Sequence, residues 1–128
     1  MDKVQVANFL KFFKSFAVRP NGWTLVPRKK NLESITEMGV TIQQVKAALL
    51  GLKVTDYCSG PEEDRDRKGI HIWVFGAKIN HEEIYIQLSD DFKGDQAKCL
   101  SFHKAEFPLR KPFKESEDEN ENDILFRM

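Results

Sequence analysis

Residues 83–103, EIYIQLSDDFKGDQAKCLSFH, hold two stretches in which apolar and polar side chains alternate, separated by a polar segment around Gly94. Alternation with a period of two is typical of a β-strand with one buried face, so the segment predicts a β-hairpin. The face toward the core is predicted to carry Ile84, Ile86, Leu88, Leu100 and Phe102. The open face is predicted to carry Tyr85, Gln87, Cys99, Ser101 and His103.

The register of this hairpin follows from its symmetry. Tyr85 and His103 each lie nine residues from Gly94, so a hairpin centred on that glycine places them directly opposite each other. Cross-strand neighbours have Cβ atoms about 4.5–5.5 Å apart. The sequence therefore predicts a phenol beside an imidazole on the open face of the sheet.

The residues upstream complete the fold class. Residues 70–75, IHIWVF, predict a further strand whose inward residues are Ile70, Ile72 and Val74. Its open-face residues are predicted to be His71, Trp73 and Phe75. Helical spacing of apolar residues predicts helices over 3–18, 31–38 and 42–50, the second with Asn31 as its N-cap. Helices followed by strands indicate an α+β domain, with the N-terminal helices packed on one face of an antiparallel sheet of about four strands.

Charge divides the chain into a basic body and an acidic end. Of 20 basic and 20 acidic residues, one base and six acids lie in 115–128, ESEDENENDILFRM, which leaves 19 bases and 14 acids in 1–114. Residues 1–114 are predicted to form a single domain, and residues 115–128 an acidic, flexible tail. The basic surplus is compatible with a polyanionic ligand. Two interpretations of the tail stay open: disorder, or acids that cover the basic site while Ile124, Leu125 and Phe126 anchor them.

Neither membrane insertion nor export is predicted. No apolar run reaches the roughly 18 residues that a membrane helix needs, and the first residues lack the apolar core and cleavage site of a signal peptide. Cys58 and Cys99 form no CxxC pair and no His/Cys cluster, so we expect reduced thiols. These features predict a cytoplasmic protein that uses no metal or cofactor.

Chemistry is expected on the open face. Metal-free RNA cleavage needs a base for the ribose 2′-OH, cations for the phosphate and an acid for the departing 5′ oxygen. His103 can transfer a proton in either direction near neutral pH with Tyr85 beside it, and Trp73 or Phe75 is predicted to stack on a base. The cations predicted to bind the phosphate are Arg67, Lys68, Lys104 and Arg110. The plain alternative is that Tyr85 and His103 are ordinary surface residues of a sheet.

Four short motifs, taken in order, resemble one family of bacterial toxins. These motifs are LLGLKVTDY (49–57), IWVF (72–75), EIYIQL (83–88) and CLSFHKAEFPLRKPF (99–113). They are similar to the MqsR family, which belongs to the RelE-like ribonuclease fold. The resemblance implies a type II toxin–antitoxin toxin that cleaves mRNA and is neutralised by a cognate antitoxin, with the ribosome as a further candidate partner. It also implies that the family's active-site tyrosine falls on Tyr85 and its C-terminal catalytic lysine on His103.

Two positions depart from the family pattern. Ser59 and Val74 stand where the family's type member has a lysine and a glutamine. A second hypothesis is therefore a non-catalytic RelE-like binding domain of phage or plasmid origin, which binds a protein or RNA without cutting. Growth arrest by the wild type, but not by a His103→Ala variant, would favour the enzyme.

Overall fold

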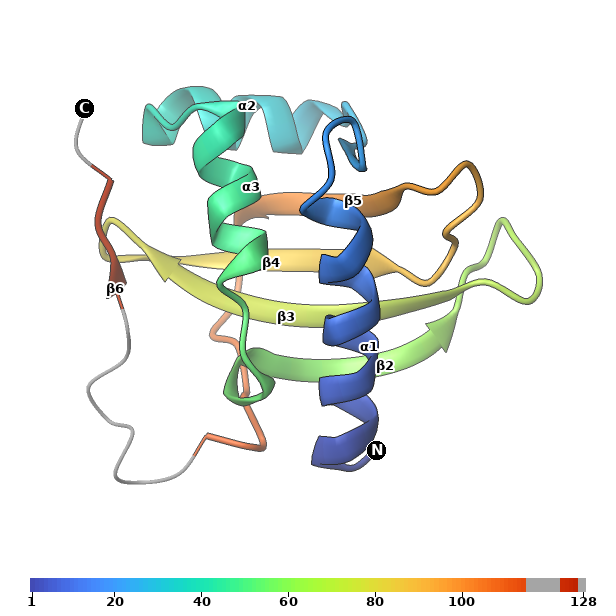
Figure 1. Cartoon of the computed structure of the whole chain (residues 1–128). Coiled ribbons are helices and arrows are strands. Elements are labelled where there is room, and N and C mark those ends of the chain that lie inside the picture. Colours follow the sequence, from blue (N-terminus) through green and yellow to red (C-terminus); the bar gives the residue numbers. More distant parts are fainter. Residues whose placement is uncertain (115–122, 127–128) are drawn as a thin grey trace.

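The computed structural model describes residues 1–114 and 123–126, and Figure 1 shows their arrangement. Its helices are α1 (Lys3–Ala17), α2 (Lys29–Met38), α3 (Ile42–Leu50) and a short 3₁₀ helix, η1 (Val54–Asp56). Its strands are β1 (Trp23–Leu25), β2 (Tyr57–Glu63), β3 (His71–Ile79), β4 (Glu82–Ser89), β5 (Ala97–Lys104) and β6 (Asp123–Ile124). The predicted α+β class is confirmed. The helix α2 begins earlier than predicted, with Arg28 rather than Asn31 as its N-cap.

The strands form one mixed sheet in the order β1-β5-β4-β3-β2, with β6 beside β3. The pairs β2–β3, β3–β4 and β4–β5 are antiparallel, whereas β1–β5 and β3–β6 are parallel. The prediction of a wholly antiparallel sheet is therefore wrong. Both parallel strands are very short, and each pairs with a partner far along the chain. The turn at residues 19–22 and Pro27 do predict a short extended segment over residues 23–26, but no local signal predicts the strand with which it pairs.

The main core lies between the sheet and the two helices α1 and α3, which cover one of its faces (Figure 1). α1 starts at a capping box in which Asp2 and Gln5 each accept the other's backbone N–H, and Thr41 and Gln44 form the same device at α3. The inward face of α1 carries Val6, Phe9, Leu10, Phe13 and Ala17. Burial of these apolar faces is the main stabilising contribution to the fold.

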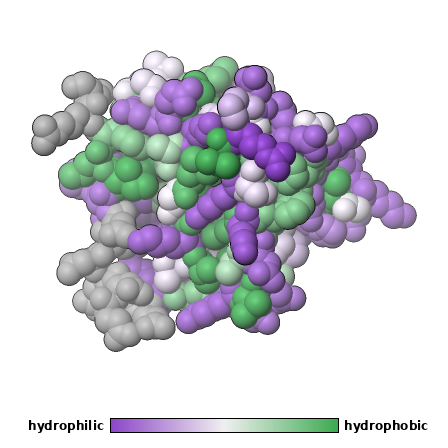
Figure 2. All heavy atoms as spheres, viewed as in Figure 1, coloured by the Kyte–Doolittle hydropathy of each residue, from purple (hydrophilic) through white to green (hydrophobic). Residues whose placement is uncertain are grey.

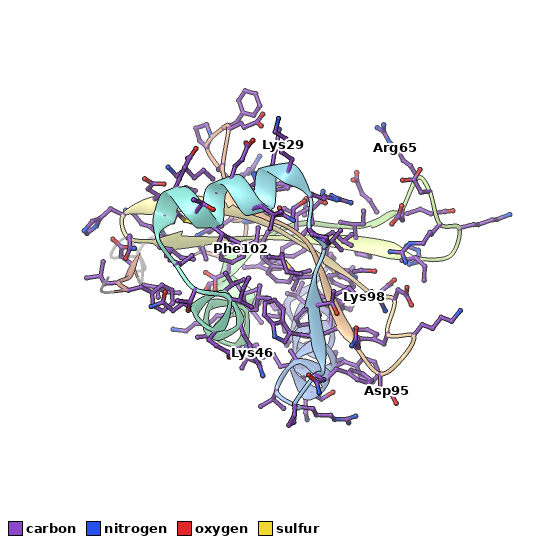
Figure 3. The ribbon with its side chains drawn as sticks, turned by 90° about the horizontal axis from the view of Figure 1, so that it is seen from above. Lys29, Lys46, Arg65, Asp95, Lys98 and Phe102 are labelled. Atoms are coloured by element: carbon purple, nitrogen blue, oxygen red, sulfur yellow. The ribbon has the colours of Figure 1, made fainter. Side chains whose placement is uncertain are left out.

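The helix α2 does not share that face; it lies along the β5 edge of the sheet (Figure 1 and Figure 3). β1 pairs with β5 only as far as Cys99. Beyond that point the buried Asn31 of α2 donates from Nδ2 to the carbonyl of Leu100 (3.0 Å) and accepts at Oδ1 from the amide of Phe102 (2.9 Å). Side chains of α2 therefore continue the hydrogen bonding that β1 begins.

The strand β3 has the opposite phase from the predicted one. Trp73 points toward the helices: it is 8% exposed, and its ring stacks on Phe9 with a centroid distance of 4.3 Å. Phe75 is buried on the same side, while Ile72 and Val74 are partly exposed. Both faces of this strand are apolar, so alternation alone does not set its phase, and the larger rings take the core side. The predicted position of Trp73 on the open face is wrong, and base stacking by Trp73 loses its structural support.

An irregularity between β4 and β5 turns Cys99 inward. The register steps from Gln87↔Ser101 to Leu88↔Cys99, so β5 has one extra residue at this point. Cys99 is fully buried in the core instead of lying on the open face as predicted. Beyond the bulge the predicted phase holds, with Phe102 buried in the core and His103 partly exposed.

After β5 the chain crosses the sheet face opposite α1 and α3 (Figure 1). Gly76 marks the crossing, because a Cβ there would lie 2.7 Å from Cδ1 of Leu109 and 3.1 Å from Cε of Lys111. Of the predicted tail, residues 123–126 return to the sheet, where Asp123 and Ile124 form β6 beside the end of β3. Residues 115–122 and 127–128, with most of the acids proposed to cover the site, lie outside the described residues.

Candidate active site

The open face of β4 and β5 brings Tyr85 and His103 together. The two residues are direct partners in the antiparallel register, which confirms the register predicted from the symmetry of the hairpin. Their rings stack with centroids 5.3 Å apart and an angle of 27° between the planes. Both residues are partly exposed, so a phenol and an imidazole stand side by side at the surface.

A backbone contact assigns the tautomer of His103. Its Nδ1 lies 3.0 Å from the carbonyl oxygen of Lys104. A carbonyl oxygen can only accept a hydrogen bond, so Nδ1 carries the proton of the neutral ring. Nε2 then carries the lone pair and is the nitrogen that can take a proton from a substrate.

Three further side chains form a hydrogen-bonded chain that ends at Tyr85. Gln87 donates from Nε2 to the Tyr85 hydroxyl (2.9 Å), and its Oε1 accepts from Ser101 Oγ (3.0 Å). Arg28 directs Nη1 to the same Ser101 Oγ (3.2 Å) and to Gln87 Oε1 (3.5 Å). Because the Tyr85 oxygen accepts the bond from Gln87, its own proton can be donated to another group.

No sequence signal identifies Arg28 as part of this site. It is 73 residues from Ser101 in the chain and lies in the short connection between β1 and α2. Its only local feature is the basic run Arg28-Lys29-Lys30, which is common on protein surfaces. Alternation does place Gln87 on the open face. There it pairs with Val74 of β3.

Lys104 lies on the other side of β5 from His103. Its ammonium group forms ion pairs with Glu37 of α2 (3.1 Å) and Glu82 of β4 (3.2 Å). Hydrogen bonds to these two carboxylates raise the pKa of Lys104. Because consecutive residues of a strand point to opposite faces, the structure does not bring Lys104 to the Tyr85–His103 pair.

The loop between β2 and β3 holds Arg67 and Lys68 at the far end of the sheet. Arg67 pairs with Asp91 at 2.9 Å, and Lys68 is exposed in the same loop, which Arg65 marks in Figure 3. β3 begins after this loop at His71, and Gly76, five residues later, is the cross-strand partner of Tyr85. At about 3.3 Å per residue of strand, the loop is therefore roughly 16 Å from Tyr85. Neither cation is therefore brought to the site.

The segment after β5 borders the site on the side of Gly76. Lys111, whose side chain is 7% exposed, approaches Glu83 at 4.0 Å. Burial raises the pKa of the neighbouring Cys58 thiol to about 11, so this thiol is protonated at neutral pH. Arg110 is exposed on this segment, and within residues 1–114 no hydrogen bond or ion pair joins it to Tyr85 or His103.

In the described part of the chain, no three His, Cys, Asp or Glu side chains converge as metal ligands would. No helix there is long and apolar enough to cross a membrane.

The candidate site consists of five side chains on the open face: Arg28, Tyr85, Gln87, Ser101 and His103. No protein-family model, curated protein or solved structure matches this chain.

Proposed function

We propose that this chain is a metal-independent endoribonuclease that cleaves mRNA, with the RelE-like architecture and the MqsR-type toxin role that its motifs resemble. The observation that carries the proposal is the stacked Tyr85–His103 pair on the open sheet face. The chain Arg28–Ser101–Gln87 beside it supplies hydrogen-bond donors, which phosphate chemistry needs. The proposal implies a cognate antitoxin, a cytoplasmic site of action and the ribosome as a candidate partner.

The proton transfers follow from the assigned hydrogen bonds. Nε2 of His103 accepts the proton of the ribose 2′-OH, and the 2′ oxygen attacks the adjacent phosphorus. As this bond forms, the bond from phosphorus to the 5′ oxygen breaks, and the leaving oxygen takes the proton of the Tyr85 hydroxyl. The products are a 2′,3′-cyclic phosphate and a 5′-hydroxyl end, and solvent returns the proton from His103 to Tyr85.

The test is cleavage of a mixed-sequence RNA by the purified protein in EDTA. We expect His103→Ala and Tyr85→Phe each to lower the rate by about 10²–10⁴, the usual contribution of a positioned acid or base. The matched control is His81→Asn, which removes an imidazole that is 78% exposed in the β3–β4 turn. His81 has a φ of 68°, a conformation that asparagine adopts readily, so this variant keeps its turn and should keep its activity.

Two results for His103→Ala decide whether the pair carries the cleavage reaction. Lost cleavage together with an unchanged circular dichroism spectrum would support the proposed role of Tyr85 and His103. Equal cleavage by the wild type and His103→Ala would reject it.

A non-catalytic binding domain is the second candidate function. It is favoured by the ion pairs of Lys104 and Arg67, which neutralise two of the predicted phosphate-binding cations. The helix-covered face also carries apolar residues among hydrophilic ones (Figure 2), and Val4 and Phe12 of α1 are 67% and 53% exposed. Growth arrest by both the wild type and His103→Ala would favour this binding function over RNA cleavage.

A further inference from the structure

We infer that Arg28 binds the scissile phosphate at the Tyr85–His103 pair, and that Gln87 and Ser101 are positioning residues that hold its guanidinium group. This inference rests on the proposed endoribonuclease function. It assigns the phosphate-binding role to a residue that precedes α2, in place of the four cations that the sequence predicts.

Arg28 differs from the lysines around it in the groups that it contacts. Ion pairs occupy three of these lysines: Lys29–Glu33, Lys30–Glu106 and Lys104–Glu37. Among the described residues, the hydrogen bonds of the Arg28 guanidinium go to an amide oxygen and a hydroxyl, both neutral, and Arg28 is exposed. A guanidinium carries five N–H donors in a planar fork, so the donors that Nη1 does not use can bind an anion.

The Gln87 carboxamide sets the spacing between Arg28 and Tyr85. Arg28 contacts its oxygen end and Tyr85 contacts its nitrogen end. Two oxygens of one phosphate are separated by nearly the same distance as the oxygen and nitrogen of a carboxamide. A phosphate above Gln87 can therefore accept from the guanidinium at a non-bridging oxygen while its 5′ oxygen faces the Tyr85 hydroxyl, with His103 stacked beside Tyr85.

The position of Arg28 is set before any ligand arrives. Its backbone amide donates to Val26 (2.8 Å), and its carbonyl accepts from Leu32 in the first turn of α2 (3.1 Å). Asn31, also in the first turn of α2, is tied to β5 by two hydrogen bonds. Ser101, which is 4% exposed, links the guanidinium to Gln87. Donors that are oriented in advance stabilise developing charge more than donors that must reorganise.

The test is the kinetics of Arg28→Gln on the same RNA. We expect kcat to fall about 10²–10³-fold with little change in KM, because the contact strengthens as charge grows on the phosphate. Arg28→Lys should recover only part of the loss, since an ammonium group lacks the planar fork. The side chain of Arg28 makes no capping hydrogen bond, so α2 should form in both variants.

Lys29→Gln is the matched control. It removes the same charge one residue away, from a side chain that is 89% exposed, and should keep kcat within about twofold because exposed charges are screened by salt. A raised KM with unchanged kcat in Arg28→Gln would place Arg28 on another part of the RNA and overturn the inference. Unchanged kcat and KM would overturn it as well, while the loss of activity in His103→Ala would leave the proposed function standing.

Binding measurements decide the case in which the wild type does not cleave. Absence of cleavage by the wild type would reject the proposed function. The affinities of the wild type and Arg28→Gln for the same RNA would then be compared over a range of salt concentrations. A lower affinity with a salt slope reduced by about 0.7 would keep Arg28 as a phosphate contact. Equal affinity and equal slope would reject it.

Discussion

Asn31 of α2 occupies the position that a neighbouring strand would have beside β5. Its amide nitrogen donates to the carbonyls of Val26 and Leu100, and its oxygen accepts from the amide of Phe102. The side chain is fully buried, so it supplies a partner away from water to the carbonyl of Leu100 and the amide of Phe102, whereas the carbonyl of Val26 also accepts from the amide of Arg28. A single polar side chain thus joins the segment that carries Arg28 to the strand that carries His103.

Replacement of Asn31 by alanine should lower the free energy of unfolding by about 2–4 kcal/mol, because it leaves buried backbone groups without partners. Urea denaturation of the purified variant measures this change. Lys29→Ala, in the same turn but mostly exposed, should change the free energy by less than about 0.5 kcal/mol. Equal losses in the two variants would show that the hydrogen bonds of Asn31 contribute nothing specific.

The sequence predicts some site residues well and others not at all. The pairing of Tyr85 with His103 agrees with a hairpin centred on Gly94, although the pairs nearer the turn follow a register one residue away and the bulge in β5 makes up the difference. Arg28 is not predictable, because only the packing of α2 against β5 brings it to Ser101. Both faces of β3 are apolar, so alternation alone does not show which face is buried. The packing of the larger rings places Trp73 toward the core, where it stacks on Phe9.

One carboxylate makes three of the contacts in the connection between β4 and β5. Asp91 accepts from the backbone amide of Lys93 (3.0 Å) and forms ion pairs with Arg67 (2.9 Å) and Lys98 (3.6 Å). The hydrogen bond from Lys93, followed by the charges of Lys98 and Arg67, lowers the pKa of Asp91. Arg67, which the sequence offers as a phosphate ligand, therefore helps to close the end of the hairpin that carries the site.

The sign of the pH effect follows from the lowered pKa. A carboxylate that is easier to ionise in the folded state adds stability above its unfolded pKa, near 4, and this stability is lost as the pH falls through the folded pKa. Asp91→Asn should therefore cost about 1–2 kcal/mol at pH 7 and less at pH 3, which is below the unfolded pKa. Chemical denaturation of wild type and variant at both pH values measures the difference.

Asp95→Asn provides the control for this element. It removes one negative charge from the same connection, where Asp95 is exposed and points away from the sheet (Figure 3). Its effect on stability should be within about 0.5 kcal/mol at either pH. A cost for Asp91→Asn that stays constant from pH 7 to pH 3 would contradict the role of the charge.

Elements differ in how far the sequence determines them. The helices α1 and α3 carry strong periodicity and capping boxes, and their bounds match the predicted ones closely. The short strands β1 and β6 have no such signal, since a strand of two or three residues exists only through its partner. The bulge in β5 likewise depends on pairing across the sheet and reverses the predicted direction of Cys99.

The whole molecule is asymmetric across its sheet. Helices α1 and α3 cover one face, which leaves the polar residues of β4 and β5 to form a network on the other. The segment after β5 covers part of that open face, and its contacts there include Gly76 and Glu83, beside Tyr85. This asymmetry concentrates hydrogen-bonding chemistry on one side, which sequence alternation predicts in outline.

The chain returns to the sheet at its far end through β6. The amide of Asn80 donates to the carbonyl of Ile124 (2.8 Å), and the Asn80 side chain accepts from the amide of Phe126 (2.8 Å). Ile124 and Phe126 pack against the core, whereas Leu125 between them is 61% exposed. In the described part of the predicted tail, alternate side chains therefore face the core and the solvent, as in a strand.

This pattern predicts unequal costs for three neighbouring substitutions. Phe126→Ala and Ile124→Ala should each lower the free energy of unfolding by about 1–2 kcal/mol, since each removes partly buried apolar surface. Leu125→Ala should change it by less than about 0.5 kcal/mol, because its side chain lies mostly in water. Thermal and urea unfolding of the full chain measure all three. If the three variants unfold like the wild type, this end of the chain does not hold to the sheet in solution. If Leu125→Ala costs as much as its neighbours, the register of β6 against β3 is wrong.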